Sequence, residues 1–150
     1  MNSDRVPENE IEEPSKPQAT FAGLATGEIL EAVGHIRQSR TMKGCPKLMR
    51  MLDFVVEATV GGEAAYLKET TLGVFVFGRK PDYDPKVDTI VRSQAWRLRA
   101  KLKKYYATEG LHDSIIVSLP RGHYVPLFQS RTTIVERTHH HAESGDSTPQ

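Results

Sequence analysis

The apolar positions of this chain recur every three or four residues in three stretches, a spacing that places them on one face of a helix. The first stretch covers residues 26–38, the second 46–60 and the third 88–107. The positions that share a face are Ile29, Leu30, Val33 and Ile36 in the first; Leu48, Met51, Leu52, Val55 and Val56 in the second; and Val91, Ala95, Leu98, Leu102 and Tyr105 in the third. We therefore expect three amphipathic helices, each with one buried face.

Residues that start and stop helices bound these stretches. Pro46 suits the first turn of the second helix, and the glycine pair at 61–62 closes it. Ahead of the third helix, Asp84 is a candidate N-cap with Pro85 at the first helical position. Gly110 is expected to end that helix.

The stretch after the third helix predicts a β-hairpin at 114–128. Residues 115–119 (IIVSL) are rich in β-branched side chains, and 123–128 (HYVPLF) can return the chain as a second strand. The tripeptide Pro-Arg-Gly at 120–122 favours a tight turn between them. Pro126 cannot donate to a ladder, so the second strand should lie at an edge or end there. Helices followed by this hairpin predict an α+β domain.

Basic residues concentrate on the third predicted helix. The whole chain has 20 Lys and Arg against 19 Asp and Glu, whereas residues 40–129 alone hold 15 against 9. Between 88 and 104 the single acid is Asp88, and the basic residues are Arg92, Arg97, Arg99, Lys101, Lys103 and Lys104. A solvated helix surface accounts for such a face in many proteins. A basic helix face is also the arrangement with which proteins attract the phosphates of DNA.

Two strings carry a resemblance to a known family. IVRSQAWRLRAKL at 90–102 and IVSLPRGHYVPLF at 116–128 resemble the C-terminal half of OmpR/PhoB-type winged helix-turn-helix DNA-binding domains. Upstream, LKE, VFGR and the YDP-D-IVR string look like the N-terminal winged helix modules of bacterial multidomain regulators, and the similarity covers about residues 48–128. The resemblance implies a three-helix core with a C-terminal β-hairpin wing, to which the 26–38 helix is a short N-terminal addition.

The chain departs from that family in two places. No strand pattern precedes Leu48, where OmpR/PhoB domains open with a small antiparallel sheet, and Trp96 stands where a smaller or more polar residue is common. Residues 64–78 are ambiguous, because residues 74–77 (VFVF) fit a buried strand while Leu67, Leu72 and Phe75 fit a helix. We favour the helix because a helix-turn-helix needs one before its recognition helix.

The resemblance also implies roles for single residues. The 88–107 helix would enter the major groove of double-stranded DNA, with Ser93 and Arg97 toward base edges, and the 114–128 wing would contact the backbone or minor groove. The expected DNA-binding residues are Arg92, Ser93, Trp96, Arg97, Arg99, Lys103, Lys104 and Arg121. Phosphate contacts are expected from Arg92, Arg99, Lys103, Lys104 and Arg121. For Trp96, packing against the hairpin or the N-terminal helix is the favoured alternative.

The rest of the chain sets the domain boundaries. We expect disordered tails at 1–22 and 130–150, where little can be buried, an amphipathic helix within 24–42 and the winged helix domain at 45–129. Cys45 is the only cysteine, which excludes an internal disulfide. With no signal segment and no apolar run of about 20 residues, the sequence predicts a cytoplasmic protein without membrane contact.

The sequence contains no motif that is typical of metal binding or of catalysis. Asp82, Asp84 and Asp88 lack the other ligand positions of a calcium loop and suit turns and caps better. The histidines at 139–141 form no defined site in a tail. There is no nucleophile elbow and no phosphate-binding glycine loop. We therefore expect no metal, no cofactor and no enzymatic activity.

The sequence thus predicts a stand-alone bacterial transcriptional regulator that binds specific double-stranded DNA sequences. A homodimer or a regulatory protein partner would control it. The alternative is a protein–protein interaction or adaptor module that uses the same basic face without binding DNA.

Overall fold

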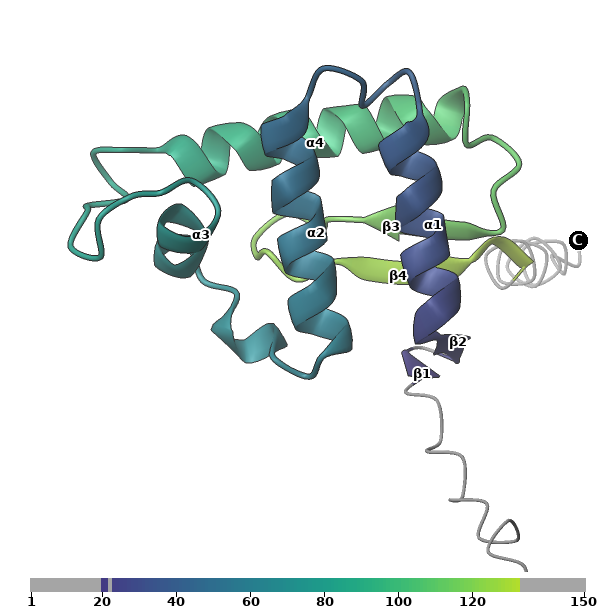
Figure 1. Cartoon of the computed structure of the whole chain (residues 1–150), viewed down its shortest axis with the longest axis horizontal. Helices are drawn as coiled ribbons and strands as arrows, with labels where there is room; N and C mark the ends of the chain where they lie inside the picture. Colours follow the sequence, from purple (N-terminus) through teal and green to yellow (C-terminus); the bar gives the residue numbers. More distant parts are fainter. Residues whose placement is uncertain (1–19, 22, 133–150) are drawn as a thin grey trace, which may run out of the picture.

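Two helices, α1 (Thr26–Gln38) and α2 (Pro46–Val60), lie side by side, and α4 (Ile90–Ala107) runs across their upper ends (Figure 1). This computed structural model describes residues 20, 21 and 23–132. A hairpin of β3 (Ile115–Ser118) and β4 (Leu127–Ser130) lies below α4 in the same view. The short helix α3 (Glu69–Phe75) and the 3-10 helix η2 (Ala64–Tyr66) connect α2 to α4. Helices and antiparallel strands together make a mixed α+β fold, as predicted.

The first two helices have the predicted bounds. Pro46 is the first residue of α2, and Gly61 follows its last, with the Gly61 N–H donating to the Glu57 carbonyl at 2.9 Å. In α1 the buried face is turned slightly from the prediction, because Ala32 is buried while Leu30 is 45% exposed. Leu30 therefore does not belong to the apolar face, and the small alanine takes its place against the core.

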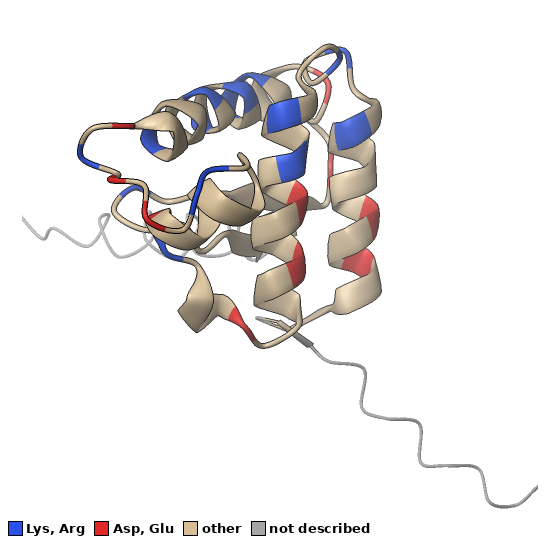
Figure 2. Cartoon of the chain, turned by 60° about the vertical axis from the view of Figure 1, so that its left-hand side comes forward, with Lys and Arg blue, Asp and Glu red and all other residues tan. Residues whose placement is uncertain are grey.

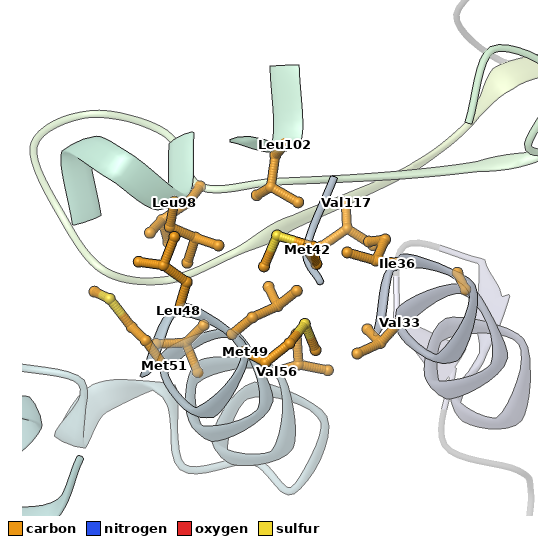
Figure 3. Close-up of a cluster of buried hydrophobic side chains, with 14 of the residues drawn as sticks. Val33, Ile36, Met42, Leu48, Met49, Met51, Val56, Leu98, Leu102 and Val117 are labelled. Atoms are coloured by element: carbon orange, nitrogen blue, oxygen red, sulfur yellow. The ribbon is translucent and has the colours of Figure 1, made fainter. Parts of the chain in front are cut away.

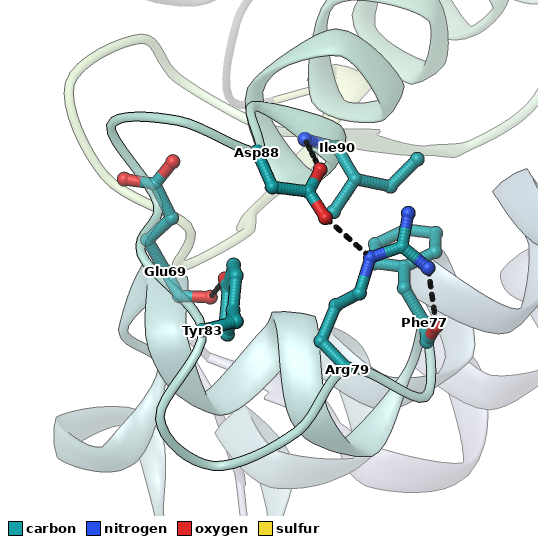
Figure 4. A network of polar contacts seen from close by, with 6 residues as sticks. All are labelled: Glu69, Phe77, Arg79, Tyr83, Asp88 and Ile90. Carbon is teal, nitrogen blue, oxygen red and sulfur yellow. Dashed lines mark hydrogen bonds and ion pairs between the residues drawn. The ribbon is translucent and has the colours of Figure 1, made fainter.

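The helix α4 begins later than predicted. Asp84 does cap a turn, since its Oδ1 accepts a backbone N–H two residues on, but that turn is not continued and the helix starts at Ile90. Asp88 supplies the carboxylate at the true start: its Oδ1 accepts the Ile90 N–H at 3.1 Å (Figure 4). The prediction of Pro85 as the first residue was wrong, because a proline fits the first position of any turn. Asp84 and Asp88 therefore have the predicted turn role, whereas the N-cap position of α4 is occupied by Thr89 and not by Asp84.

The end of α4 depends on a close contact between the Tyr105 ring and the backbone of Gly110. The last helical residue is Ala107, and the N–H of Gly110 donates to the Tyr105 carbonyl at 2.7 Å. A Cβ added to Gly110 would lie 2.3 Å from Cε1 of Tyr105. Glycine is therefore needed here because the Tyr105 ring packs onto the backbone of the turn that follows the helix.

The helical interpretation of the ambiguous stretch is confirmed. α3 runs to Phe75, and residues 76 and 77 form a turn rather than a strand. The buried side of this short helix uses Leu72, and Val76 follows it into the core. Phe75 lies on the other side of α3, where it is 71% exposed and stacks on Phe54 of α2.

The connection from α3 to α4 is held by a polar network. Nε of Arg79 donates to Oδ2 of Asp88 at 2.6 Å, and its Nη1 donates to the Phe77 carbonyl at 3.1 Å (Figure 4). The Tyr83 hydroxyl donates to the Glu69 carbonyl at 2.9 Å. Arg79 thus joins the two ends of the 76–89 segment to each other, Tyr83 joins its middle to α3, and Asp88 joins its end to the first residue of α4.

The hairpin is shorter and its loop longer than predicted. β3 and β4 pair antiparallel with Val117 opposite Phe128, and residues 119–126 form the loop between them. The second strand begins only after Pro126, because proline has no N–H for the ladder. The expectation of a tight turn at 120–122 with a strand from His123 was therefore wrong.

Two strands precede the first helix. β1 (Thr20–Phe21) pairs antiparallel with β2 (Leu24–Ala25), although no strand pattern was expected before Leu48. Strands of two residues are too short to show an alternating pattern. The predicted tails at 1–22 and 130–150 otherwise fall largely outside the described residues, as do the histidines at 139–141, but β1 and Ser130 of β4 belong to ordered elements.

The buried side chains of α1, α2, α4 and the hairpin form one core (Figure 3). Met51 and Leu52 of α2, Leu98 of α4 and Val117 of β3 are fully buried. From α1, the fully buried Ile36 packs into the same core. Since α4 buries its side toward this core, its opposite side is left for solvent. Within residues 20–132 no helix combines the length and apolar composition that crossing a membrane requires.

Alkaline pH is expected to destabilise the fold through Tyr106, whose side chain lies between α4 and β3. The Val117 N–H donates to the Tyr106 hydroxyl at 2.8 Å, and burial raises the pKa of Tyr106 to about 12. Between pH 10 and 12 the unfolded chain loses this proton while the folded chain keeps it, so the free energy of unfolding falls as pH rises. The contribution of Tyr106 should be about 1 kcal/mol smaller at pH 11 than at pH 9.

Urea unfolding at both pH values tests this expectation. Tyr106→Phe should flatten the pH dependence, whatever its effect at neutral pH. An unchanged slope in that variant would mean that other groups cause the loss, among them Tyr105, whose pKa burial and the Asp113 carboxylate also raise.

Candidate nucleic-acid interface

The outer side of α4 is a ridge that projects from the core. The inner side of the helix packs into the core through the buried residues Val91, Ala95, Leu98, Leu102 and Tyr105. At 3.6 residues per turn the positions opposite this stripe share one line along the helix. We call this line the crest of α4, and it consists of Ser93, Trp96, Ala100, Lys103 and Ala107. All five are exposed.

A groove runs along each side of this ridge. The first lies between α4 and the start of α2, and it is lined on the helix side by Arg97, Lys101 and Lys104. The second lies between α4 and the hairpin, with Lys103 on one wall and Arg121 on the other. Trp96 and Ala100 line both grooves, because they stand on the crest between them.

Trp96 does not pack as expected. Its side chain is 67% exposed, so neither the hairpin nor the N-terminal helix covers it. The favoured sequence interpretation for this residue was therefore wrong, and the indole is available for contact with another molecule.

Arg99 is engaged inside the protein. Its Nε donates to the Leu119 carbonyl at 2.8 Å, and its Nη2 lies 3.2 Å from the Pro120 carbonyl and 3.3 Å from that of His123. One guanidinium thus binds both ends of the turn in the hairpin loop. The structure places Arg99 as a tether between α4 and the loop rather than as a free cation.

Arg92 is also paired within the fold. Its Nε lies 2.9 Å from Oε1 of Glu69, and its Nη2 donates to Oε2 of the same carboxylate at 3.2 Å. Tyr124 of the hairpin loop lies beside this pair: burial and the Glu69 charge raise its pKa, while Arg92 and Arg99 act in the opposite direction. Arg92 therefore joins α4 to α3 and to the loop, which keeps the three elements in register.

The other basic candidates face solvent. Arg97, Lys103, Lys104 and Arg121 are exposed, and none of them has an ion pair or side-chain hydrogen bond within the described residues. Arg121 sits in the hairpin loop next to Gly122, whose φ of +96° is one that glycine adopts readily. These four cations, together with Ser93 and the exposed Trp96, are the predicted residues that remain free to contact a ligand.

The fold adds basic residues that sequence reasoning missed. Lys47 at the start of α2 lines the first groove opposite Arg97 and Lys104. Figure 2 shows the basic residues of α4 at the same end of the molecule as those near the upper ends of α1 and α2, while acidic residues lie farther down both helices. Only the packing of α2 against α4 brings Lys47 to the site, so no local pattern could have identified it.

The surface offers no evident metal chemistry. Among residues 20, 21 and 23–132, no group of three or more histidine, cysteine or acidic side chains is arranged to hold an ion. Comparisons of the chain with family models, with curated proteins and with solved structures found no match.

Proposed function

We propose that this chain is a winged helix protein that binds specific sequences of double-stranded DNA. In this proposal α2, α3 and α4 are the three-helix core, α4 is the recognition helix, and the β3–β4 hairpin with its 119–126 loop is the wing. The major groove of B-DNA is about 12 Å wide and admits one α-helix. A projecting α4 with a groove on either side suits that insertion, because the grooves leave room for the two phosphate backbones.

The observation that carries the proposal is the set of unpaired cations around the crest of α4. Exposed Lys and Arg side chains without protein partners can neutralise phosphates and release counterions. We assign phosphate contacts to Lys47, Lys103, Lys104 and Arg121. Ser93 and Arg97 are assigned to base edges, because arginine can bind guanine O6 and N7 with two hydrogen bonds. Arg92 and Arg99 hold the helix and wing in place instead.

Such a protein would act as a transcriptional regulator in the bacterial cytoplasm, where its DNA targets are accessible. Dimerisation or a regulatory partner would control it. Selection of bound duplexes from a random pool would report the preferred sequence and whether two half-sites recur at a fixed spacing.

Arg97→Ala and Lys103→Ala are expected to weaken DNA binding in different ways. Arg97→Ala should cost about 1–3 kcal/mol on the selected site and relax the preference at one base pair. Lys103→Ala should weaken binding to every sequence and reduce the slope of log K against log salt by about one. Fluorescence anisotropy on selected and scrambled duplexes over a salt series measures both effects.

Arg50→Ala is the matched control for these variants. Arg50 is exposed on α2, but it lines the surface between α1 and α2 rather than either groove beside α4. It should leave affinity and salt slope close to those of the unmodified chain. If all three variants have equal small effects, α4 is not the DNA-reading element.

A protein-binding function is the second candidate, and the exposed indole of Trp96 favours it. Large exposed aromatic side chains beside apolar grooves are typical of protein interfaces. Gel retardation of the full chain with random duplex DNA separates the two functions. No retardation even at about 50 mM salt would contradict the DNA proposal and favour the interaction module.

A further inference from the structure

Trp96 is a large apolar side chain on a face of α4 that is otherwise rich in cations. It is the only tryptophan of the chain and is 67% exposed, while the neighbouring cations Arg97, Lys103 and Lys104 are also exposed. Leaving an aromatic ring in water forgoes the free energy of its burial. Because the described part of the fold does not cover this ring, a bound ligand would bury it.

The neighbours of Trp96 on the crest are small. Ser93 lies three residues before it and Ala100 four residues after it, so both share its line along the helix. Their side chains are short, and the indole therefore stands beyond them. Lys103 lies on the crest two turns beyond Trp96, and the other basic side chains of this surface lie on the flanks, in the two grooves that Trp96 and Ala100 divide. The outer side of α4 is thus an apolar centre between two cationic edges.

The major groove has a matching layout, with base edges along its floor and phosphates along both rims. Most groups on that floor are hydrogen-bond donors or acceptors, and the apolar one is the C5-methyl group of thymine. An indole set against the polar edges would leave donors and acceptors without partners, which is costly. When the indole ring packs against a methyl group, no hydrogen-bonding group of the base edge is covered, and apolar surface is buried on both molecules.

We propose that Trp96, with Ala100 one turn away, reads the C5-methyl groups of thymine at the centre of the DNA site. This inference rests on the proposed function and specifies its ligand: a duplex with thymine where the crest of α4 meets the groove floor. Single-stranded DNA fits less well, since successive bases stack on several aromatic side chains. The other aromatic residues of α4 are the buried Tyr105 and the half-buried Tyr106.

Thymine and deoxyuridine differ only in this methyl group, and their exchange tests the inference. Each thymine of the selected duplex is replaced in turn by deoxyuridine, and the affinity of the full chain is measured by anisotropy. One or two positions should lose affinity roughly fourfold, which corresponds to one buried methylene-sized group at ~0.8 kcal/mol. With Trp96→Ala, thymine and deoxyuridine at those positions should bind equally.

Lys103→Ala is the control, because it lies on the same crest and carries no apolar ring. It should weaken binding to both duplexes and leave their ratio unchanged. Circular dichroism would check that the Trp96→Ala variant is folded, and Trp96→Phe should retain part of the methyl preference.

The outcomes separate this inference from the function on which it rests. Specific binding without any deoxyuridine effect, or an effect that survives Trp96→Ala, would overturn the methyl readout and leave DNA binding intact. Failure of the unmodified chain to bind any duplex at low salt would overturn both.

Discussion

Replacing Gly73 with alanine is expected to destabilise the fold by about 3 kcal/mol, although alanine is the better helix former. Gly73 lies inside α3 and is buried. A Cβ at this position would lie 2.0 Å from the Tyr83 hydroxyl oxygen and 2.3 Å from its Cζ. The Tyr83 ring would have to leave its place, and its hydrogen bond to the Glu69 carbonyl would be lost with it.

Gly34→Ala provides the matched control in urea unfolding. Gly34 also lies inside a helix, α1, but nothing stands within 4 Å of the Cβ it would gain. That variant should be stabilised by about 0.5–1 kcal/mol through helix propensity alone. In a Tyr83→Ala background, Gly73→Ala should lose most of its cost because the clash is gone. Similar unfolding midpoints for Gly73→Ala and Gly34→Ala would contradict the tight contact.

The sequence predicted those parts of the fold whose causes are local. The bounds of α1 and α2 followed from apolar spacing, Pro46 and the glycines at 61–62, which all act within one helix. The start of α4 did not, because Asp84 and Asp88 both follow the rules for a cap and only the tertiary contact of Asp88 with Arg79 distinguishes them. The role of Gly73 was equally hidden, since its partner Tyr83 lies ten residues away in an irregular segment.

The candidate site likewise has features that the sequence could predict and features that it could not. The side of α4 that faces solvent followed from its period, so the exposure of Ser93, Arg97 and Lys103 could be predicted. Which cations are free could not, because Arg92 and Arg99 have the same sequence context but find partners on α3 and on the hairpin loop. Free and paired arginines are distinguished only by contacts between residues that are 20 or more positions apart.

Replacing Arg99 with methionine is expected to destabilise the hairpin loop and, through it, DNA binding. Methionine keeps most of the apolar stem but removes the guanidinium that binds the carbonyls of Leu119, Pro120 and His123. Hydrogen bonds from a charged donor contribute about 1.5–3 kcal/mol. Because this guanidinium is partly exposed, we expect the free energy of unfolding to fall by about 2 kcal/mol. Hydrogen exchange of amides at 119–126 should accelerate, which mass spectrometry of peptic fragments measures.

Arg97→Met separates this tether from a residue that contacts DNA directly. It makes the same chemical change two positions away, on a side chain that has no partner within the described part of the protein. Its unfolding free energy should stay within about 0.5 kcal/mol of the unmodified chain. Its affinity for the selected duplex should nevertheless fall at least tenfold, or about 1.4 kcal/mol. Loop exchange should not change in this variant.

Arg99→Lys decides whether residue 99 acts by charge or by geometry. Lysine keeps the positive charge but lacks the planar fork that reaches several carbonyls at once. If Arg99 holds the loop that carries Arg121, the lysine variant should exchange as fast at 119–126 and bind DNA as weakly as Arg99→Met. Near-normal affinity of Arg99→Lys would instead mean that residue 99 binds a phosphate through its charge, and that the contacts with the loop carbonyls give way when DNA is bound.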